Sequence, residues 1–453
     1  MQLFYKYGKF NVLKTAPGSQ SDSLMKNGKV DRINQKNTGV LTIMAEFLPF
    51  NGLLPVPEKA DKVAAVPYDV VDSAEAAALA EGNPISFLHV SRPEIDMEPG
   101  IDLHDDRVYA QAKAGFDRLC KEVPLLIDPE KHLYVYQLEM KGRVQTGVIG
   151  AASAEDYRTG IIKKHERTRQ DKEDDRTRHV MTLRSHTGPA FFTYRDSAKI
   201  DQVIAEETAK TPLVNFVAVD GIRHTLWRVD AAKSEALADL FRSEVPVFYI
   251  ADGHHRSAAA ARTAAECAPH NPNHTGKEDY NYFLAVAFPA KQLAILPYNR
   301  VVKSLNGLSK DGFIAKISES FTVTPADNGE VENSGEFKFY LDKAWYLAKP
   351  KFDINQLGVI EKLDVSWLQD RILAPVLGIA DPRTSKDIDF IGGIRGTGEL
   401  MKRVDSGSWA VAFSMYATTV DQLMDIADAG EIMPPKSTWF EPKLRDGLVS
   451  HNF

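Results

Sequence analysis

The chain of 453 residues has 43% hydrophobic and 26% charged residues, an average composition for a soluble globular protein, which excludes a disordered or fibrous chain. Its 55 basic and 62 acidic residues leave a net charge of −7, so a dedicated nucleic-acid binder is not expected. The chain has only two cysteines and no apolar run of the roughly 20 residues that a membrane span needs, which predicts a protein of the reducing cytoplasm without membrane contact.

A typical domain has roughly 100 to 200 residues, so the length predicts two or three units. Residues 1–43 are polar and show neither the period of a helix nor that of a strand, so we expect a disordered extension that ends before Met44. The rest predicts an α+β fold with an N-terminal unit over 44–160, a central core over 161–302 and a C-terminal unit over 303–453.

The N-terminal unit mixes helix and strand patterns. Residues 62–71 predict a strand that enters a turn, and the alanine-rich stretch at 73–82 predicts a short helix. A full helix is expected over 107–122. The β-rich segments on either side of "KGR" predict a hairpin over 132–153.

The stretch at 161–186 differs from its surroundings because eight Lys or Arg and three His stand among five acidic residues. Mixed-sign charge runs are usually exposed helix faces. We therefore expect a solvated, salt-bridged helix over 168–179, with the side chains at 171–178 facing water.

Downstream, apolar runs alternate with amphipathic stretches. They predict strands at 188–196, 214–220, 224–230 and 245–251, and helices at 199–210, 231–243 and 256–268. Residues 281–302 predict a second hairpin. Beyond residue 303 we expect a hairpin at 336–350, helices at 363–378 and 419–429, and an irregular final stretch at 433–449.

The segment "YIADGHHRSAAA" places five polar or glycine residues where a strand passes into a helix. Helix N-termini present unpaired N–H groups and a positive dipole end, so they hold phosphate oxygens. Gly253 lets the main chain approach an anion, Arg256 can grip it, and His254 and His255 can donate hydrogen bonds. Asp252 has the opposite sign, which predicts a helix cap, a substrate contact or a share in Mg²⁺ binding.

A tight turn and a zinc site are the two alternatives for this segment. Asp252 and Gly253 alone are typical of a tight turn, with both histidines exposed. Zinc is not expected, because adjacent histidines point in different directions and no third His or Cys stands at a local ligand spacing.

The strand, "DGHHR" and helix resemble the phosphate-binding box of the ParB and sulfiredoxin superfamily, most closely that of its free L-serine kinases. The wider chain resembles a bacterial family catalogued as a domain of unknown function, some of whose members are ATP-dependent serine kinases. The supporting segments run from Met44 almost to the C-terminus: "PFNGLLP", "VPYDVV", "GNPISFLHVSRPE", "KKHERT", "KEDDRTRH", "TGPAFFTY", "IADGHHRSAAA", "ILPYNRVV" and "MPPKSTWFEPKL". The resemblance implies a ParB/sulfiredoxin-like nucleotide-binding core over 161–302.

The sequence differs from two groups of this superfamily, which excludes their functions from the expectation. Sulfiredoxin-like proteins carry a reactive cysteine in the box, where this chain has His254, so sulfinic acid repair is not expected. DNA-partitioning relatives continue into a helix-turn-helix domain, whereas the downstream pattern here is mixed α and β, so a role on DNA is not expected.

The resemblance therefore implies a kinase of amino-acid metabolism that converts free L-serine to O-phospho-L-serine, with ATP or ADP as donor and Mg²⁺ as the metal. Phosphoryl transfer to an alcohol needs a phosphate cradle and a carboxylate that accepts the hydroxyl proton. In the related kinases this base is a glutamate in a His-Glu segment, which falls on Glu166 here. Asp252 would position serine or Mg²⁺.

Further site residues are implied by the same resemblance. The proline-stiffened loop "MPPKST" would offer phosphate-binding groups from Lys436, Ser437 and Thr438, although it lacks the glycines of a P-loop. Substrate binding is expected from Asp69, His165 and Arg167. For Asp69, a cap near the following helix is an equal alternative.

Two other functions stay open. One is a nucleotide-binding regulatory protein of the ParB type, and the other is a kinase of another small hydroxyl compound. Serine and a nucleotide are the expected partners, and the sequence does not decide whether the chain forms a homo-oligomer.

Overall fold

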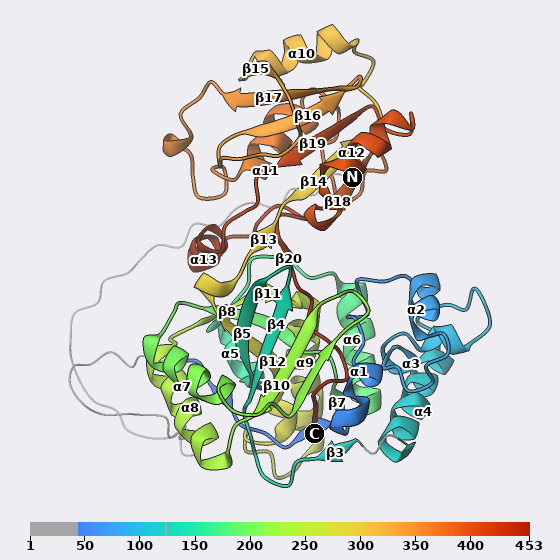
Figure 1. Cartoon of the computed structure of the whole chain (residues 1–453), viewed down its shortest axis with the longest axis vertical. Helices are drawn as coiled ribbons and strands as arrows, with labels where there is room; N and C mark the ends of the chain where they lie inside the picture. Colours follow the sequence, from blue (N-terminus) through green and yellow to red (C-terminus); the bar gives the residue numbers. More distant parts are fainter. Residues whose placement is uncertain (1–43, 123–124) are drawn as a thin grey trace, which may run out of the picture. The chain divides into compact units, whose positions relative to one another are not determined.

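The computed structural model describes residues 44–122 and 125–453, so the extension expected at 1–43 lies outside the described residues. The described residues form an α+β protein with one nine-stranded sheet, one six-stranded sheet and two small sheets (Figure 1). Among these residues, no helix is long and apolar enough to cross a membrane.

The nine-stranded sheet has the order β6-β11-β8-β12-β5-β4-β10-β9, with β1 paired to β5. Its strands are β1 (Phe47–Leu48), β4 (Tyr134–Met140), β5 (Arg143–Ser153), β6 (Ile162–Lys163), β8 (Ala190–Tyr194), β9 (Val214–Val217), β10 (Arg223–Arg228), β11 (Phe248–Asp252) and β12 (Tyr282–Pro289). The pairs β6/β11 and β8/β12 are parallel. Because strands from both sides of residue 160 share this sheet, the expected boundary at that residue does not separate two sheets.

One face of this sheet is covered by helices and forms an aromatic core. The helices are α5 (Ala154–Thr159), α7 (Ala198–Thr208), α8 (Ala231–Glu244) and α9 (His254–Cys267). Phe248 is fully buried, and its ring centroid lies 5.7 Å from that of Phe192 and 6.0 Å from that of Phe241. Burying each such ring contributes about 1.5–3 kcal/mol. Small alanine side chains on α9 let this helix pack closely on the sheet.

The opposite face is covered in part by the C-terminal stretch. Phe440, Leu444 and Val449 share one core with Tyr249 and Phe191 of the sheet. Two short strands fix this return: β20 (Trp439–Phe440) pairs with β13 (Ile295–Leu296), and β21 (Ser450–Asn452) pairs with β2 (Gly52–Leu54) and β7 (Ser185–His186). The end of the chain, expected to be largely irregular, thus lies beside strand β11.

A third core joins the helices near the N-terminus to α6. These helices are α1 (Ala60–Val63), α2 (Ser73–Ala80), α3 (Leu88–Ser91), α4 (Asp106–Glu122) and α6 (Gln170–Leu183). The strand expected at 62–71 is wrong, because α1 ends there and only Ala65 forms a bridge, with Asp446. The expectation of a solvated helix over 168–179 is also wrong. Helix α6 packs on α4 and α9, and the side chains of Asp175 and Arg176 are only 10% and 12% exposed.

The six-stranded sheet has the order β15-β17-β16-β19-β14-β18. Its strands are β14 (Tyr298–Val302), β15 (Phe321–Ala326), β16 (Phe337–Leu341), β17 (Ala344–Pro350), β18 (Ile388–Gly392) and β19 (Val411–Met415). It packs with α10 (Lys310–Ser318), α11 (Asp364–Leu368), α12 (Gly396–Asp405) and α13 (Val420–Asp428).

The hairpins expected at 132–153 and 336–350 are confirmed. The hairpin expected at 281–302 is wrong, because β12, β13 and β14 pair in three different sheets. The local pattern predicted the strands but not their partners, which lie elsewhere in the chain.

Candidate active site

The charged segment and the "DGHHR" junction meet because two short strands pair in parallel. Ile162 of β6 lies opposite Phe248 of β11, and Lys163 lies opposite Tyr249. Parallel strands end at the same edge of a sheet, so the residues that follow them emerge together. His165 and the start of α9 are therefore neighbours although they lie far apart in the sequence.

The N-terminus of α9 is open. Gly253 is its N-cap with φ 90° and ψ 33°, in the left-handed region, and among the described residues no side chain caps the helix. A Cβ atom on Gly253 would lie 3.0 Å from Nε of Arg256 and 3.3 Å from Cα of Ala190. Both the backbone conformation and the space require glycine. The first N–H groups of the helix remain available to an anion.

A cleft of about 1460 Å³ lies at this helix start. It is lined by every residue that the sequence singled out: Asp69, His165, Glu166, Arg167, Asp252, Gly253, His254, His255, Arg256, Lys436, Ser437 and Thr438. Nine Lys or Arg and six Asp or Glu line it, whereas the whole chain carries a net charge of −7. The cleft is therefore locally basic in an acidic protein, which favours an anionic ligand.

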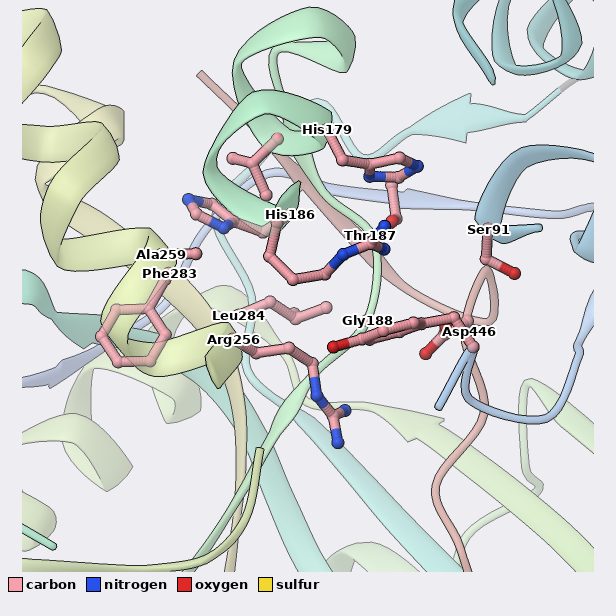
Figure 2. Close-up of a pocket in the computed structure, with 13 residues that line it drawn as sticks. Ser91, His179, His186, Thr187, Gly188, Arg256, Ala259, Phe283, Leu284 and Asp446 are labelled. Atoms are coloured by element: carbon pink, nitrogen blue, oxygen red, sulfur yellow. The ribbon is translucent and has the colours of Figure 1, made fainter. Parts of the chain in front are cut away.

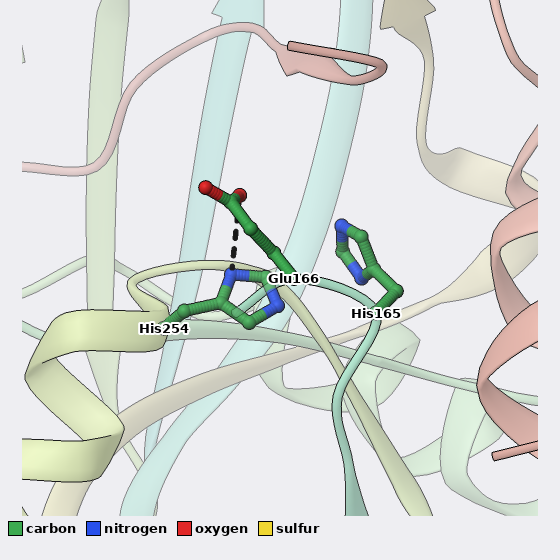
Figure 3. Close-up of side chains that lie close together, drawn as sticks. All are labelled: His165, Glu166 and His254. Atoms are coloured by element: carbon green, nitrogen blue, oxygen red, sulfur yellow. Dashed lines mark ion pairs between the residues drawn. The ribbon is translucent and has the colours of Figure 1, made fainter. Parts of the chain in front are cut away.

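Glu166 lies beside the helix start. Its Oε2 atom is 3.9 Å from Nδ1 of His254, and its side chain is 48% exposed in the cleft (Figure 3). Partial burial raises the pKa of this carboxyl, and Lys436 opposes that rise. A carboxylate with a raised pKa and an open side is suited to accept a proton.

The two histidines next to Glu166 are held neutral. Burial lowers the pKa of His165 to about 4, although the backbone of Ile250 favours the charged form. Burial and the neighbouring His165 hold the pKa of His254 well below its usual range. The rings contact edge to face, with centroids 4.5 Å apart and planes at 88°. Neutral imidazoles can each offer a nitrogen lone pair.

Asp252 is held by positive groups. Its Oδ1 accepts from the N–H of Gly253 at 2.8 Å, and its Oδ2 lies 3.0 Å from Nζ of Lys443 and 3.7 Å from Nη2 of Arg256. Burial raises its pKa, but Lys443 and Arg256 outweigh burial and hold the pKa below the usual range. Both oxygens are engaged with these groups, and the expected share of Asp252 in Mg²⁺ binding stays a prediction.

Arg256 is turned partly away from the cleft. Its Nη1 donates to the carbonyl of Pro189, and its side chain is only 10% exposed. It also lines a smaller cavity of about 40 Å³ together with Tyr68, Arg176 and Asp446. Figure 2 shows Arg256 and Asp446 at this cavity. Burial raises the pKa of Asp446 to about 7, although Arg256 opposes this. Arg256 thus contributes a positive charge at the helix start, and one nitrogen of its guanidinium already donates a hydrogen bond.

The remaining predicted residues line the cleft from separate loops. Nε2 of His255 accepts from the N–H of Arg169 at 3.1 Å, which fixes that ring. Asp69 stands on a turn after residue 67 and raises the pKa of Lys443 together with Asp252, against the effect of burial. Arg167 is exposed on the loop after β6.

The "MPPKST" loop is tied to the cleft wall. Met433 donates its N–H to the carbonyl of His165 at 2.8 Å, and the carbonyl of Lys436 accepts from Nη2 of Arg300 at 3.0 Å. Lys436 has φ 57°, a conformation that non-glycine residues rarely adopt. The hydroxyl of Ser437 donates to the carbonyl of Pro434 at 2.6 Å, and Nζ of Lys436 lies 5.5 Å from the centre of the Tyr298 ring.

Among the cleft residues that the sequence did not single out, three lie close to the predicted site. Lys443 follows the loop in "WFEPK" and reaches Asp252, while Trp439 and Tyr298 form an aromatic corner with ring centroids 5.0 Å apart. Nζ of Lys443 lies 5.2 Å from the Trp439 ring. A lysine beside tryptophan after a proline-rich loop was the only available signal, and it does not identify Asp252 as the partner.

A family model described as "Protein of unknown function (DUF1015)" matches residues 47–366. No curated protein matches the chain.

Several solved structures are similar to the chain. A free serine kinase in complex with AMP is 13% identical with a TM-score of 0.32, covering 65% of this chain and 86% of its own. A conserved hypothetical protein from Pyrococcus furiosus is 15% identical with a TM-score of 0.32, covering 67% and 94%. SbnI from Staphylococcus aureus, with a C-terminal truncation, is 10% identical with a TM-score of 0.36, covering 66% and 85%.

Proposed function

The chain belongs to the DUF1015 family, and from the geometry of its cleft we propose that it is an ATP-dependent kinase that converts free L-serine to O-phospho-L-serine. The observation that carries the proposal is the position of Glu166, whose carboxylate stands in a basic cleft 3.9 Å from the first residue of an uncapped helix. A proton acceptor and a phosphate cradle are thereby adjacent, as phosphoryl transfer to an alcohol requires.

In this proposal β11 and α9 form the nucleotide-binding part of a ParB/sulfiredoxin-like core. The N–H groups of His254 and His255 at the helix start would hold the phosphates, and Lys436 would add positive charge on the other wall. Trp439 and Tyr298, whose ring planes stand at 86°, would offer this aromatic corner to the base of the nucleotide. Mg²⁺ would arrive bound to the phosphates.

The proposed phosphoryl transfer needs only serine and Mg²⁺-ATP as reactants. The hydroxyl oxygen of serine attacks the γ-phosphorus of ATP while its proton passes to the carboxylate of Glu166, and the bond to the bridging oxygen breaks to release ADP. Lys443 would hold Asp252, and with it the turn at Gly253, in place. Asp69, His165 and Arg167 line the same cleft and would contact the amino acid.

The test is product formation with a matched pair of variants. Wild-type protein with L-serine and Mg²⁺-ATP, or Mg²⁺-ADP, should yield phosphoserine in a mass spectrum. Glu166→Gln should lower turnover by about 10²–10⁴-fold, the usual effect of a general base, while nucleotide binding persists. Glu235→Gln, an exposed glutamate on α8 away from the cleft, should retain full activity.

Two outcomes would separate the alternatives. If the protein phosphorylates another small alcohol and not serine, the assigned acceptor is wrong and the kinase activity is retained. Nucleotide binding by the wild type without any phosphorylated product from serine or another small alcohol would overturn the kinase and favour a regulatory protein.

A further inference from the structure

Two histidines and a glutamate converge at the edge of the nine-stranded sheet. Nitrogen atoms of His165 and His254 and a carboxylate oxygen of Glu166 all lie within 4.8 Å of one another. Figure 3 shows the two imidazoles side by side and the carboxylate next to the ring of His254. The three side chains come from two segments that meet only through the parallel pairing of β6 and β11.

A buried imidazole nitrogen at this point lacks a partner. Within residues 44–122 and 125–453, the ring of His165 forms no hydrogen bond of normal geometry and is only 2% exposed, although the backbone of Ile250 lies close enough to favour its charged form. Buried polar atoms are nearly always paired, and one backbone group can satisfy only one of the two ring nitrogens, so the other nitrogen of His165 points to a missing ligand. The edge-to-face contact with the ring of His254 explains the packing of the two rings and does not satisfy that nitrogen.

The ligand chemistry selects one class of ion. Two imidazole nitrogens and one carboxylate are the ligand set of zinc-type sites with one open position, whereas Mg²⁺ and Ca²⁺ prefer oxygen ligands. Ligand atoms around a tetrahedral ion stand roughly 3.4 Å apart. The 3.9 Å between Nδ1 of His254 and Oε2 of Glu166 therefore needs only a small side-chain rotation.

We propose that His165, Glu166 and His254 bind one divalent transition-metal ion of the zinc or cobalt class. The side chain of Glu166 is the exposed member, so the open coordination position faces the cleft. The expectation that zinc is absent considered ligand spacing near His254 in the sequence, and the other two ligands, His165 and Glu166, come from a distant segment. An ion on one oxygen of Glu166 leaves the other carboxylate oxygen to accept a proton, and the metal site does not depend on the proposed kinase activity.

The proposal is tested with the metal alone, on full-length protein freed of metal by a chelator. Titration with Co²⁺ should give visible absorption bands of a four-coordinate ion at one equivalent, and Zn²⁺ should displace it. His165→Gln and His254→Gln should each weaken Co²⁺ binding by more than the roughly 10- to 100-fold that loss of an outer-shell partner costs. His255→Gln, in the same helix turn, should bind Co²⁺ like the wild type, because its ring already accepts from Arg169.

Several results would overturn this assignment. They are the absence of a one-to-one Co²⁺ complex in the wild type, Mg²⁺ binding as tight as Co²⁺ binding, or an equal loss in His255→Gln. If a ligand variant does not fold, the melting temperature of the wild type decides instead, since Zn²⁺ must raise it if the folded state binds the ion. No nucleotide or serine is present, so failure of the kinase proposal leaves the result intact.

Discussion

Replacing Lys443 by methionine should leave the carboxylate of Asp252 without its main counter-charge. The two groups are 3.0 Å apart, with side chains 16% and 28% exposed. Removing one partner of a fully buried pair costs about 3–5 kcal/mol, and an exposed pair contributes about 0–1 kcal/mol. Because this pair is intermediate and Arg256 remains 3.7 Å from Asp252, Lys443→Met should lower the free energy of unfolding by about 1–3 kcal/mol.

Urea unfolding at pH 7 measures this cost, and a double-mutant cycle isolates the pair. In the Asp252→Asn background the same lysine change should cost less, with a coupling of about 1 kcal/mol or more. The pKa of Asp252 is lowered on folding, so its contribution is present at pH 7 and is lost as the pH falls through the folded-state pKa. Lys277→Met, at an exposed lysine, is the control. A coupling near zero, or an equal cost in both backgrounds, would refute the ion pair.

Three further changes probe the core, the helix start and a buried carboxyl. Phe248→Ala empties the centre of the aromatic core and should cost about 3–5 kcal/mol in urea unfolding, and a loss below about 1 kcal/mol would contradict the packing. Gly253→Ala puts a Cβ at φ 90° and 3.0 Å from Nε of Arg256, so it should cost about 1–2 kcal/mol, and a neutral result would mean that the turn has another conformation. Burial raises the pKa of Asp364 from 3.8 to about 7, so this carboxyl favours folding when protonated and that contribution is lost as the pH rises from about 4 through 7. Asp364→Asn should therefore raise the free energy of unfolding at pH 8 by up to about 4 kcal/mol and change it little at pH 4, and equal effects at both pH values would exclude a raised pKa.

Local sequence patterns predicted most of the helices and strands. The helix expected at 231–243 is α8, and the one at 256–268 is the body of α9, because helical periodicity and cap signals act within a few residues. The apolar runs at 281–302 predicted a hairpin that does not form, since strand pairing depends on partners elsewhere in the chain. Asp175 was expected in water for a similar reason: its burial comes from Tyr109 on another helix, whose hydroxyl donates to it at 2.7 Å.

The sequence by itself determined that a strand runs into an alanine-rich helix through Gly253. That signal is local, because backbone conformation and helix-end chemistry are set by neighbouring residues. Glu166 as the companion carboxylate was implied only by the family resemblance. Only the tertiary structure decided that β6 pairs in parallel with β11, so that His165 meets His254, and that the C-terminal stretch returns with Lys443 to hold Asp252. Such contacts join distant segments, and their energy arises only when the sheet and its cores have formed.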